Sequence, residues 1–142
     1  MTRRVYFDTS AAMKLLHPEA HSADVARWVD DPQIEAVSSS LLETELRRGA
    51  ARWEIRQEDA TQVIDRFALY EHPGWEFKAA GLLPDRAARS LDAIHVAAAL
   101  RVEAHALVTY DARMIAAASA MGLPVIRPGI DADASVAPAG IG

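Results

Sequence analysis

The sequence contains no cysteine, which excludes disulfide bonds and thiolate metal sites. Any bound metal must therefore be held by carboxylates, histidines, hydroxyl groups or water. No uncharged apolar run approaches the ~18 residues of a membrane span. The opening residues, MTRRVYFD, also lack the roughly 7–15 apolar residues of a secretory signal. These absences predict a cytoplasmic protein that does not enter a membrane.

Lysine is also scarce, since only Lys14 and Lys78 accompany thirteen arginines. The net charge of −5 at pH 7 argues against broad, non-specific binding to nucleic acid. Arginine suits bidentate contacts with phosphate, although its abundance beside alanine also fits a bias in genome composition. Apolar residues make up 51% of the 142 positions, which is enough for the core of one domain.

Short apolar segments alternate with helical patterns along the chain. This alternation predicts βα units and a three-layer α/β/α sandwich with a central, mainly parallel sheet. Residues 129–142 have no periodicity and many small side chains, and they are predicted to form a flexible C-terminal tail. We expect strands at residues 5–7, 35–38, 68–70, 106–109 and 124–126, and helices at residues 22–29, 41–53, 58–67, 91–102 and 111–121.

Two carboxylates follow predicted strands. Asp8 comes directly after the first strand in VYFDTS, and Asp111 comes just after a later strand in VTYDAR. Each acid would serve as a helix N-cap, but Thr9 and Ser10 offer capping hydroxyls beside Asp8. Ligands of a parallel α/β sheet bind outside the carboxyl ends of the strands. We therefore expect both acids at the same edge of the sheet.

The segment SSSLLETELRRG contains two further acids. Glu43 has a sufficient structural role, because it can form a capping box with Ser40 and an ion pair with Arg47. Glu45 has no comparable role within its own helix. We therefore interpret Glu45, rather than Glu43, as the functional acid of this segment.

Asp92 opens the segment SLDAIHVAAALRVEA. With Ser90 as the N-cap, Asp92 would lie in the first turn, where the helix dipole favours an anion. The apolar residues around it also predict a buried helix, in which an acid needs a partner. Taken alone, Asp92 fits both interpretations.

Four carboxylates that share a pocket repel one another unless a cation neutralises them. Ligation by oxygen atoms alone suits Mg²⁺ or Mn²⁺, with several metal-bound waters retained. Such an ion can lower the pKa of a bound water and stabilise the oxyanions of a phosphoryl displacement. The four acids together therefore indicate hydrolysis of a phosphodiester.

The quoted segments resemble the PIN domain, and most closely the VapC-type toxins of bacterial toxin–antitoxin systems. The resemblance rests on YFDTSAAMKLL, SSSLLETELRRGAAR, RSLDAIHVAAAL and LVTYDARM followed by GLPVIRPG, in the order of the family and over nearly the whole chain. It implies a PIN-like catalytic domain at residues 1–128 and a metal-dependent endoribonuclease. It assigns catalysis and metal binding to Asp8, Glu45, Asp92 and Asp111, with supporting hydroxyls at Ser10 and Thr109.

The resemblance also implies an RNA substrate, one or two Mg²⁺ or Mn²⁺ ions, and a small VapB-like antitoxin that blocks the acidic pocket. A homodimer or a toxin–antitoxin hetero-oligomer is the expected assembly. Arg48 and Arg89 are the candidate RNA contacts. Arg48 lies in a basic helical region that suits an RNA backbone, and Arg89 lies three residues before Asp92. The alternative for the basic region is a solvated face paired with nearby glutamates.

Several aromatic and histidine residues have a structural interpretation that competes with a functional one. His95 lies three residues after Asp92, but such a histidine is more often a hydrogen-bonded core residue than a metal ligand or general base. Trp28, Trp53 and Trp75 are far apart in the sequence. One of them could stack on an RNA base, whereas packing or a dimer contact would explain the others.

Three other functions remain as alternatives at this point. A receiver-type phospho-acceptor module also has acids at strand ends, but it needs a pair of acids after the first strand and a lysine where this chain has Arg127. A haloacid-dehalogenase-type phosphatase needs D-x-D after the first strand, and this chain has D-T-S. A PIN fold that has lost activity and only binds a partner would not need the complete set of acids.

Overall fold

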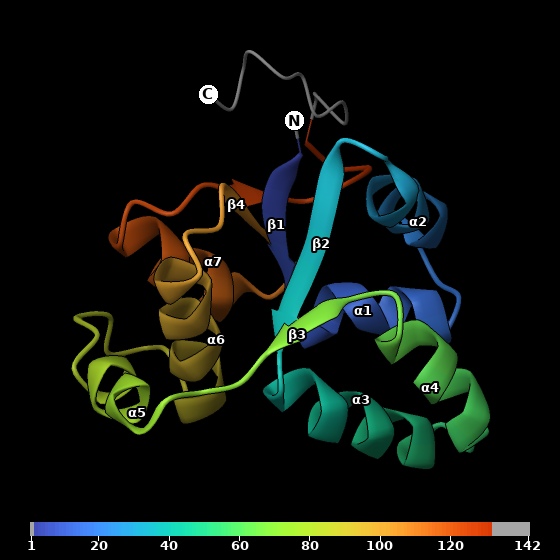
Figure 1. Cartoon of the computed structure of the whole chain (residues 1–142), viewed down its shortest axis with the longest axis horizontal. Helices are drawn as coiled ribbons and strands as arrows, with labels where there is room; N and C mark the ends of the chain where they lie inside the picture. The colour runs from blue at the N-terminus through green and yellow to red at the C-terminus, as the bar shows by residue number, and fades with distance from the viewer. Residues whose placement is uncertain (1, 132–142) are drawn as a thin grey trace.

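Five short strands form one fully parallel sheet in the computed structural model, which describes residues 2–131. The strand order is β3-β2-β1-β4-β5, so the central strand β1 pairs with β2 on one side and with β4 on the other (Figure 1). The strands are β1 (Arg3–Phe7), β2 (Ile34–Ser39), β3 (Ala68–Tyr70), β4 (Ala106–Val108) and β5 (Val125–Ile126).

Helices cover both faces of the sheet and complete the three layers. In Figure 1 the first four helices lie to the right of the sheet and the last three lie to the left. The right-hand layer contains α1 (Thr9–Leu16), α2 (Ser22–Asp30), α3 (Leu41–Arg52) and α4 (Gln57–Ile64), and the left-hand layer contains α5 (Gly74–Gly81), α6 (Ser90–Arg101) and α7 (Ala112–Ala120).

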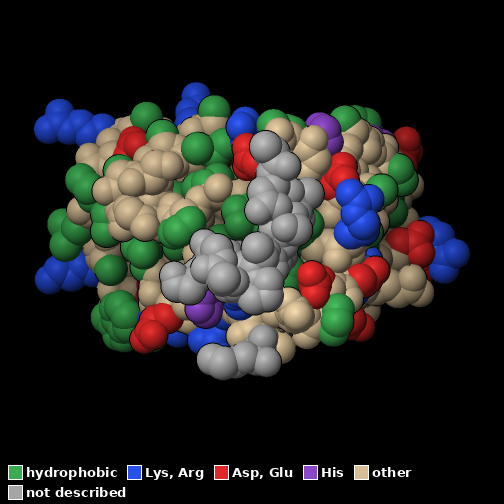
Figure 2. Space-filling model, turned by 90° about the horizontal axis from the view of Figure 1, so that it is seen from above, with side chains coloured by type: hydrophobic (Ala, Val, Ile, Leu, Met, Phe, Trp, Pro, Cys, Tyr) green, Lys and Arg blue, Asp and Glu red, His purple; other side chains and the backbone are tan. Residues whose placement is uncertain are grey.

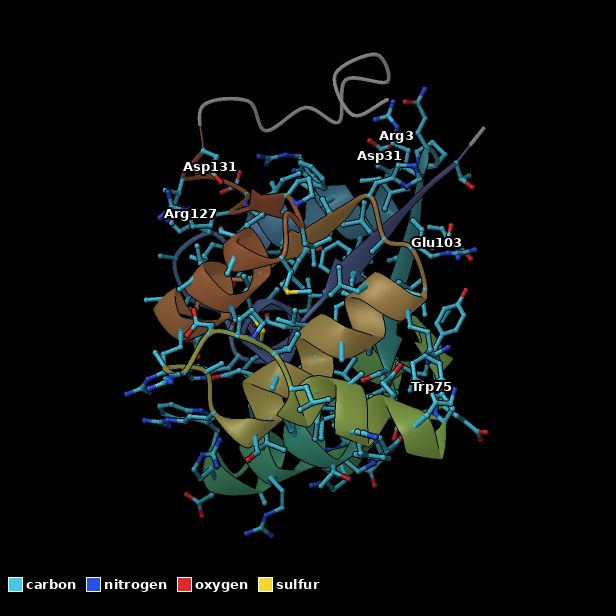
Figure 3. All side chains as sticks on the ribbon, turned by 90° about the vertical axis from the view of Figure 1, so that its left-hand side faces the viewer. Arg3, Asp31, Trp75, Glu103, Arg127 and Asp131 are labelled. Atoms are coloured by element: carbon cyan, nitrogen blue, oxygen red, sulfur yellow. The ribbon has the colours of Figure 1, made fainter. Side chains whose placement is uncertain are left out.

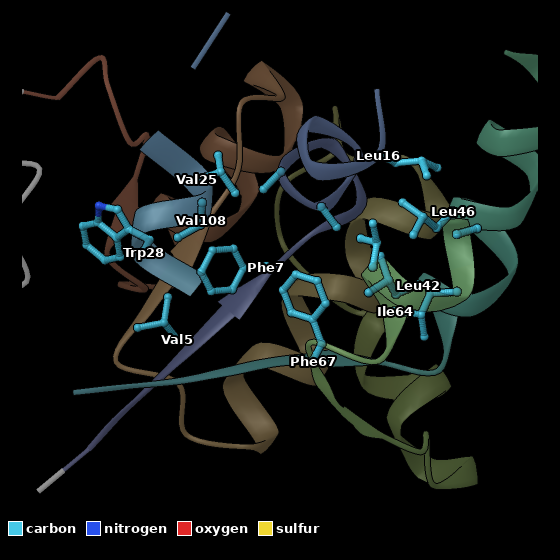
Figure 4. Packing of buried hydrophobic residues seen from close by; sticks show 14 of the residues in the cluster. Val5, Phe7, Leu16, Val25, Trp28, Leu42, Leu46, Ile64, Phe67 and Val108 are labelled. Atoms are coloured by element: carbon cyan, nitrogen blue, oxygen red, sulfur yellow. The ribbon is translucent and has the colours of Figure 1, made fainter. Parts of the chain in front are cut away.

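Alternation along β1 divides the core in two. Val5 and Phe7 point into the cluster formed with the helices of the right-hand layer, where Phe7 packs against Phe67 (Figure 4). Tyr6 points to the other face and joins the cluster formed with α6 and α7. All three side chains are fully buried. Burial on both faces explains why the strands appear in the sequence as continuous apolar runs.

The structure confirms the predicted fold class and all five predicted strands, within one or two residues at their ends. Two helices, α1 and α5, were not among the predicted patterns. The helix predicted at residues 58–67 ends earlier, at Ile64, and Phe67 packs into the core beyond it. Ser40 is the N-cap of α3, but its side chain makes no cap hydrogen bond, so the expected capping box is absent.

The predicted tail begins at residue 129, and residues 132–142 lie outside the described part of the chain. Residues 128–130 form a turn, and Asp131 after it pairs with Arg127 before it. Among residues 2–131, no helix has the length and apolar character needed to cross a membrane.

Candidate active site

The carboxyl ends of β1 and β4 lie next to each other at the point where the strand order reverses. Open α/β sheets bind ligands at such a switch point. Asp8 directly follows β1, and Asp111 follows β4 after a short turn. Thr109 joins the two segments, because its hydroxyl donates to Asp8 Oδ2 at 2.5 Å and accepts from the Asp111 N–H at 3.1 Å.

Asp8 is a buried acid whose charge meets only neutral donors. It is 2% exposed, and its Oδ1 accepts from the Ser10 hydroxyl at 2.7 Å and from the Ala11 N–H at 3.0 Å. The second bond makes Asp8 the N-cap of α1, so the capping interpretation also holds. Burial raises the pKa of the Asp8 carboxyl, and the nearby His95 and the hydrogen bonds, that of Thr109 first, offset only part of that rise.

Glu45 is held by two side chains from other elements. Its Oε1 accepts from the Thr9 hydroxyl at 2.5 Å and lies 2.7 Å from His95 Nε2. Burial raises the pKa of Glu45, but the hydrogen bond and charge of His95, together with Thr9, outweigh it and leave the pKa below its usual value. Glu45 is therefore an ionised carboxylate fixed by α1 and α6.

His95 extends this contact into the core. Its ring is 2% exposed, and Nδ1 lies 2.7 Å from the Tyr6 hydroxyl, which in turn lies 2.9 Å from the Ser39 hydroxyl. The chain of contacts thus crosses from β2 through β1 and α6 to Glu45. This arrangement agrees with the interpretation of His95 as a hydrogen-bonded core residue, and it gives the ring a second role in orienting Glu45.

Asp92 and Asp111 both interact with helix N-termini. Asp92 Oδ2 accepts from the Arg89 N–H at 3.1 Å, and Asp111 Oδ1 accepts from the N–H groups of Arg113 and Met114 at 2.8 and 3.4 Å. The expectation that Ser90 is the N-cap of α6 is wrong by one residue, because the cap is Arg89. The cap contacts fix each acid through one oxygen and leave the other available.

The spare oxygens are a shared property of three acids. Among residues 2–131, Glu45 Oε2, Asp92 Oδ1 and Asp111 Oδ2 take part in no hydrogen bond. Each of these carboxylates is held at one oxygen and can present the other to a ligand.

The structure brings some of the four acids together and leaves one apart. Thr109 links Asp8 to Asp111, and Thr9, the neighbour of Asp8, binds Glu45. Asp92 makes no hydrogen bond to the other three and lies one turn before His95 on α6. As they stand within residues 2–131, no three acidic or histidine side chains form a group that could hold a metal ion.

The donor set nevertheless fits a hard divalent ion. Mg²⁺ is usually bound through one or two carboxylates, several waters and the phosphate of a substrate, rather than by a closed protein cage. Asp8 also has a buried negative charge and, within the described chain, no ion pair. A cation at the β1–β4 switch point would compensate that charge.

The remaining predicted residues lie around these acids. Ser10 and Thr109 both donate to Asp8. Arg48 and Arg89 are exposed, on α3 and at the start of α6. Glu43 pairs with Arg47, as expected, and Arg47 also reaches the carbonyl and side chain of Gln57 and the side chain of Thr61 on α4, so Arg47 holds two helices together.

The structure adds two residues to this site, Thr9 and Tyr6, that the sequence does not identify. The sequence indicates only an alternative cap at Thr9 and a strand residue at Tyr6. The available signal was the position of Thr9 beside the strand-end acid and the polar end of an otherwise apolar strand. Neither signal identifies Glu45 or His95 as the partner, because those contacts depend on how the helices pack.

A family model described as PIN domain matches residues 5–120. The chain belongs to the PIN domain family. This PIN domain is similar to three proteins of Mycobacterium tuberculosis along 97% of their lengths and 87–88% of its own. They are Ribonuclease VapC35 (strain H37Rv; 37% identical over 131 residues), Ribonuclease VapC47 (strain CDC 1551; 32% over 132 residues) and Ribonuclease VapC46 (strain H37Rv; 33% over 127 residues).

These findings confirm the resemblance to VapC-type PIN domains. The sheet order of this PIN domain also differs from the order 2-1-3-4-5 of the flavodoxin-like fold to which receiver modules belong. In that fold the first and third strands are neighbours, whereas here β1 lies between β2 and β4. The receiver-type alternative is therefore wrong.

Proposed function

We propose that this PIN domain is an Mg²⁺- or Mn²⁺-dependent endoribonuclease that hydrolyses RNA phosphodiesters and acts as the toxin of a toxin–antitoxin pair. The observation that carries the proposal is the buried carboxylate of Asp8, which lies at the switch point and, among residues 2–131, accepts hydrogen bonds only from neutral donors. The names of the three similar proteins, all ribonucleases, support it.

Asp8 would hold the metal directly, and Glu45, Asp92 and Asp111 would complete the site through their spare oxygens or through metal-bound water. When bound, the ion supplies an activated water and neutralises charge on the phosphate. The protein contributes the orientation of the acids: Ser10 and Thr109 fix Asp8, while Thr9 and His95 fix Glu45.

Arg48 and Arg89 would contact the RNA backbone on either side of the acids. Both are exposed, and among residues 2–131 neither side chain forms an ion pair. Arginine binds phosphate through two parallel N–H groups. Replacing either residue by glutamine should therefore weaken RNA binding for all sequences alike and lower its dependence on salt.

The proposed partner is a small VapB-like antitoxin that places a basic side chain over the uncompensated acids. A cation from a protein would satisfy the same buried charge that a metal satisfies. The assembly would be a homodimer of the toxin or a hetero-oligomer with the antitoxin. Addition of the cognate antitoxin should abolish cleavage, and inhibition should weaken when its basic residue is removed.

The deciding experiment is an RNA cleavage assay on the purified, antitoxin-free chain. Parent and Asp92→Asn proteins are compared in Mg²⁺, in Mn²⁺ and in EDTA, on a panel of structured RNAs. Cleavage by the parent should require the metal, and the variant should lose it. The matched control is Asp59→Asn, because Asp59 also lies in the first turn of a helix but is exposed on α4.

Two results would contradict the proposal. If parent and Asp92→Asn cleave equally well, the activity belongs to a contaminant. If neither protein cleaves any RNA in the panel, and Mg²⁺ does not raise the thermal stability of the parent, the acids do not form a metal site.

A further inference from the structure

Helices α1 and α3 lie side by side and run in the same direction away from the acids (Figure 1). Three contacts join them at a spacing of four residues. Thr9 meets Glu45 beside the acidic site, Met13 packs on Gly49 in the middle, and His17 stacks on Trp53 at the far end. Residues four apart lie on the same face of a helix. The row is therefore a continuous line of contacts between the two helices that begins at the acids.

In the middle of this line of contacts, the close packing of α1 on α3 depends on Gly49. A Cβ atom at this position would overlap the Cε atom of Met13, so the absence of a side chain allows the two helices to approach closely. Met13 is the flexible residue of the pair and would have to move if a larger residue replaced Gly49. The close approach also brings the two helix ends together, where His17 and Trp53 meet.

The far end is an exposed aromatic platform. The rings of His17 and Trp53 lie 4.2 Å apart and nearly parallel, at an interplanar angle of 14°. Trp53 is nevertheless 55% exposed, because His17 covers only one face of its ring. His17 therefore supports one face of the Trp53 ring, and the other face is open to solvent.

Two arginines without a partner accompany the platform. Arg48 and Arg52 follow Glu45 at i+3 and i+7, so they lie on the same stripe of α3. Both are exposed, and within residues 2–131 neither forms an ion pair. Arg47 differs, since it is paired with Glu43. The stripe thus has positive charge that is not neutralised by the protein.

We propose that the surface formed by Arg48, Arg52, Trp53 and His17 binds a single-stranded segment of the RNA substrate beside the cleavage site. Two phosphates would contact the arginines, and one base would stack on the open face of Trp53. This proposal rests on the proposed ribonuclease function and adds to it the position and the strandedness of the bound RNA. Trp53 lies about 12 Å along the helix from Glu45, a span of a few nucleotides.

RNA is favoured over a protein partner by the chemistry of the surface. Unpaired bases stack on aromatic rings, and arginines neutralise the adjoining phosphates. A duplex would not fit the platform, because its bases are already stacked on one another. The opposite end of the molecule, seen in Figure 2, has basic and acidic side chains interspersed among hydrophobic ones.

The test measures binding rather than cleavage. A short fluorescein-labelled RNA of mixed sequence, single-stranded or annealed to its complement, is titrated with the full chain in EDTA, and anisotropy is recorded. Trp53→Ala should bind the single strand about tenfold more weakly, the scale of one lost base stack. Trp53→Phe should retain most of the affinity. The matched control is Trp75→Ala, since Trp75 is 61% exposed but lies on α5, across the sheet (Figure 3).

The arginines are tested by salt dependence. Each phosphate contact on a single strand adds about 0.7 to the slope of log K against log salt concentration. Arg48→Gln/Arg52→Gln should therefore lower the slope by about 1.4, and Trp53→Ala should leave it unchanged. Arg27→Gln, on the exposed face of α2, is the control and should change neither affinity nor slope.

Equal RNA binding by Trp53→Ala, Trp75→Ala and the parent would overturn the platform while leaving the ribonuclease proposal intact. A Trp53→Ala variant that keeps its RNA affinity but loses self-association in size-exclusion chromatography would also overturn it, because the surface would then be a protein interface. A parent that binds no RNA in EDTA also overturns the platform, whereas the ribonuclease proposal is decided by the cleavage assay in Mg²⁺ or Mn²⁺. Circular dichroism and thermal unfolding of each variant show that the comparison is made between folded proteins.

Discussion

Two acids are almost completely buried, one at the carboxyl end of β1 and one on α5, and they differ in what surrounds them. Asp8 is 2% exposed and Glu76, on α5, is 1% exposed. Glu76 forms an ion pair with Arg101 of α6, and its other oxygen lies 2.5 Å from His72 Nδ1. Asp8 accepts hydrogen bonds from hydroxyl groups and one backbone amide, and it pairs with no cation in the described chain.

Glu76 is therefore a structural acid, whereas Asp8 has no ion pair among residues 2–131. A buried charge is expensive unless it is paired, and Glu76 has its compensating charge within the protein. Arg101 also donates to the Glu71 carbonyl, so the pair ties α5 and the end of β3 to α6. Asp8 is also fixed by hydrogen bonds, but among residues 2–131 it has no ion pair, and the charge of the nearby His95 offsets only part of the cost of its burial. That imbalance is what a divalent ion would correct.

The strongest test of this contrast is Asp8→Asn. Cleavage should fall more than about 100-fold, which exceeds the usual effect of losing only an outer-shell partner of a metal site. The stability of the metal-free chain should change little, because the asparagine oxygen can still accept from Ser10 and Ala11, its amide group can donate to the Thr109 hydroxyl, and no charge is buried. Cleavage rates and urea unfolding in EDTA measure the two effects. A variant that unfolds would show that Asp8 is structural, like Glu76.

The corresponding variant of the structural acid is Glu76→Gln. Removing one partner of a buried pair leaves the other charge uncompensated, so the chain should lose about 2–3 kcal/mol of unfolding free energy, less than for a completely buried pair because Arg101 is partly exposed. Cleavage below the unfolding temperature should be unchanged. Chemical denaturation gives the free energy, and a marked loss of cleavage by the folded variant would place Glu76 in the functional site.

Metal binding should raise the free energy of unfolding through Asp8 and not through Glu76. At ten times its Kd, Mg²⁺ should stabilise the parent by about 1.4 kcal/mol. Glu76→Gln should gain the same increment from its lower starting point, whereas Asp8→Asn should gain none. Thermal unfolding with and without Mg²⁺ measures this, and Ca²⁺ shows whether the site selects a small ion. An equal gain in all three proteins would indicate that the ion binds elsewhere.

Without a metal, protonation of Asp8 should have a smaller effect on the free energy of unfolding. Burial raises the folded-state pKa of Asp8 above the ordinary 3.8. Between the two values the folded chain binds more protons than the unfolded chain, so stability falls as the pH rises through this window. Urea unfolding in EDTA across acidic pH should show this decline in the parent. Asp8→Asn should lack the part of this decline that Asp8 causes. Identical pH profiles of parent and variant would refute the assignment of the decline to Asp8.

The sequence predicts those features that depend on local pattern. Residues such as Val5, Phe7 and Leu107 are buried on both sides of the sheet, so their strands stand out as apolar runs between turns. Asp8 and Asp111 could be placed at one edge because parallel strands end there together. The preference for Glu45 over Glu43 followed from the pairing of Glu43 with Arg47, which the structure contains.

Features that depend on packing between distant segments were not predictable. The helix α5 is not predictable because it begins within His72-Pro73-Gly74, a strong break, and because Trp75 and Phe77 face solvent instead of marking a buried side. The burial of Glu76 requires Arg101, 25 residues further along the chain. The contact between His95 and Glu45 likewise joins residues 50 positions apart, and no local pattern indicates it.

The contact between Thr109 and Asp8 has a consequence for the time at which the protein becomes active. The two residues are separated by 101 positions, yet they form one hydrogen bond of the site. Proteins are synthesised from the N-terminus at roughly 5–20 residues per second, and pairings between distant strands form late. Under the proposed function, the growing chain carries Asp8 for roughly 5–20 seconds before Asp111 exists, and Asp92 for about 1–4 seconds. The ribosome that makes the nuclease, and the messenger RNA it reads, are therefore not exposed to a complete site until synthesis is nearly finished.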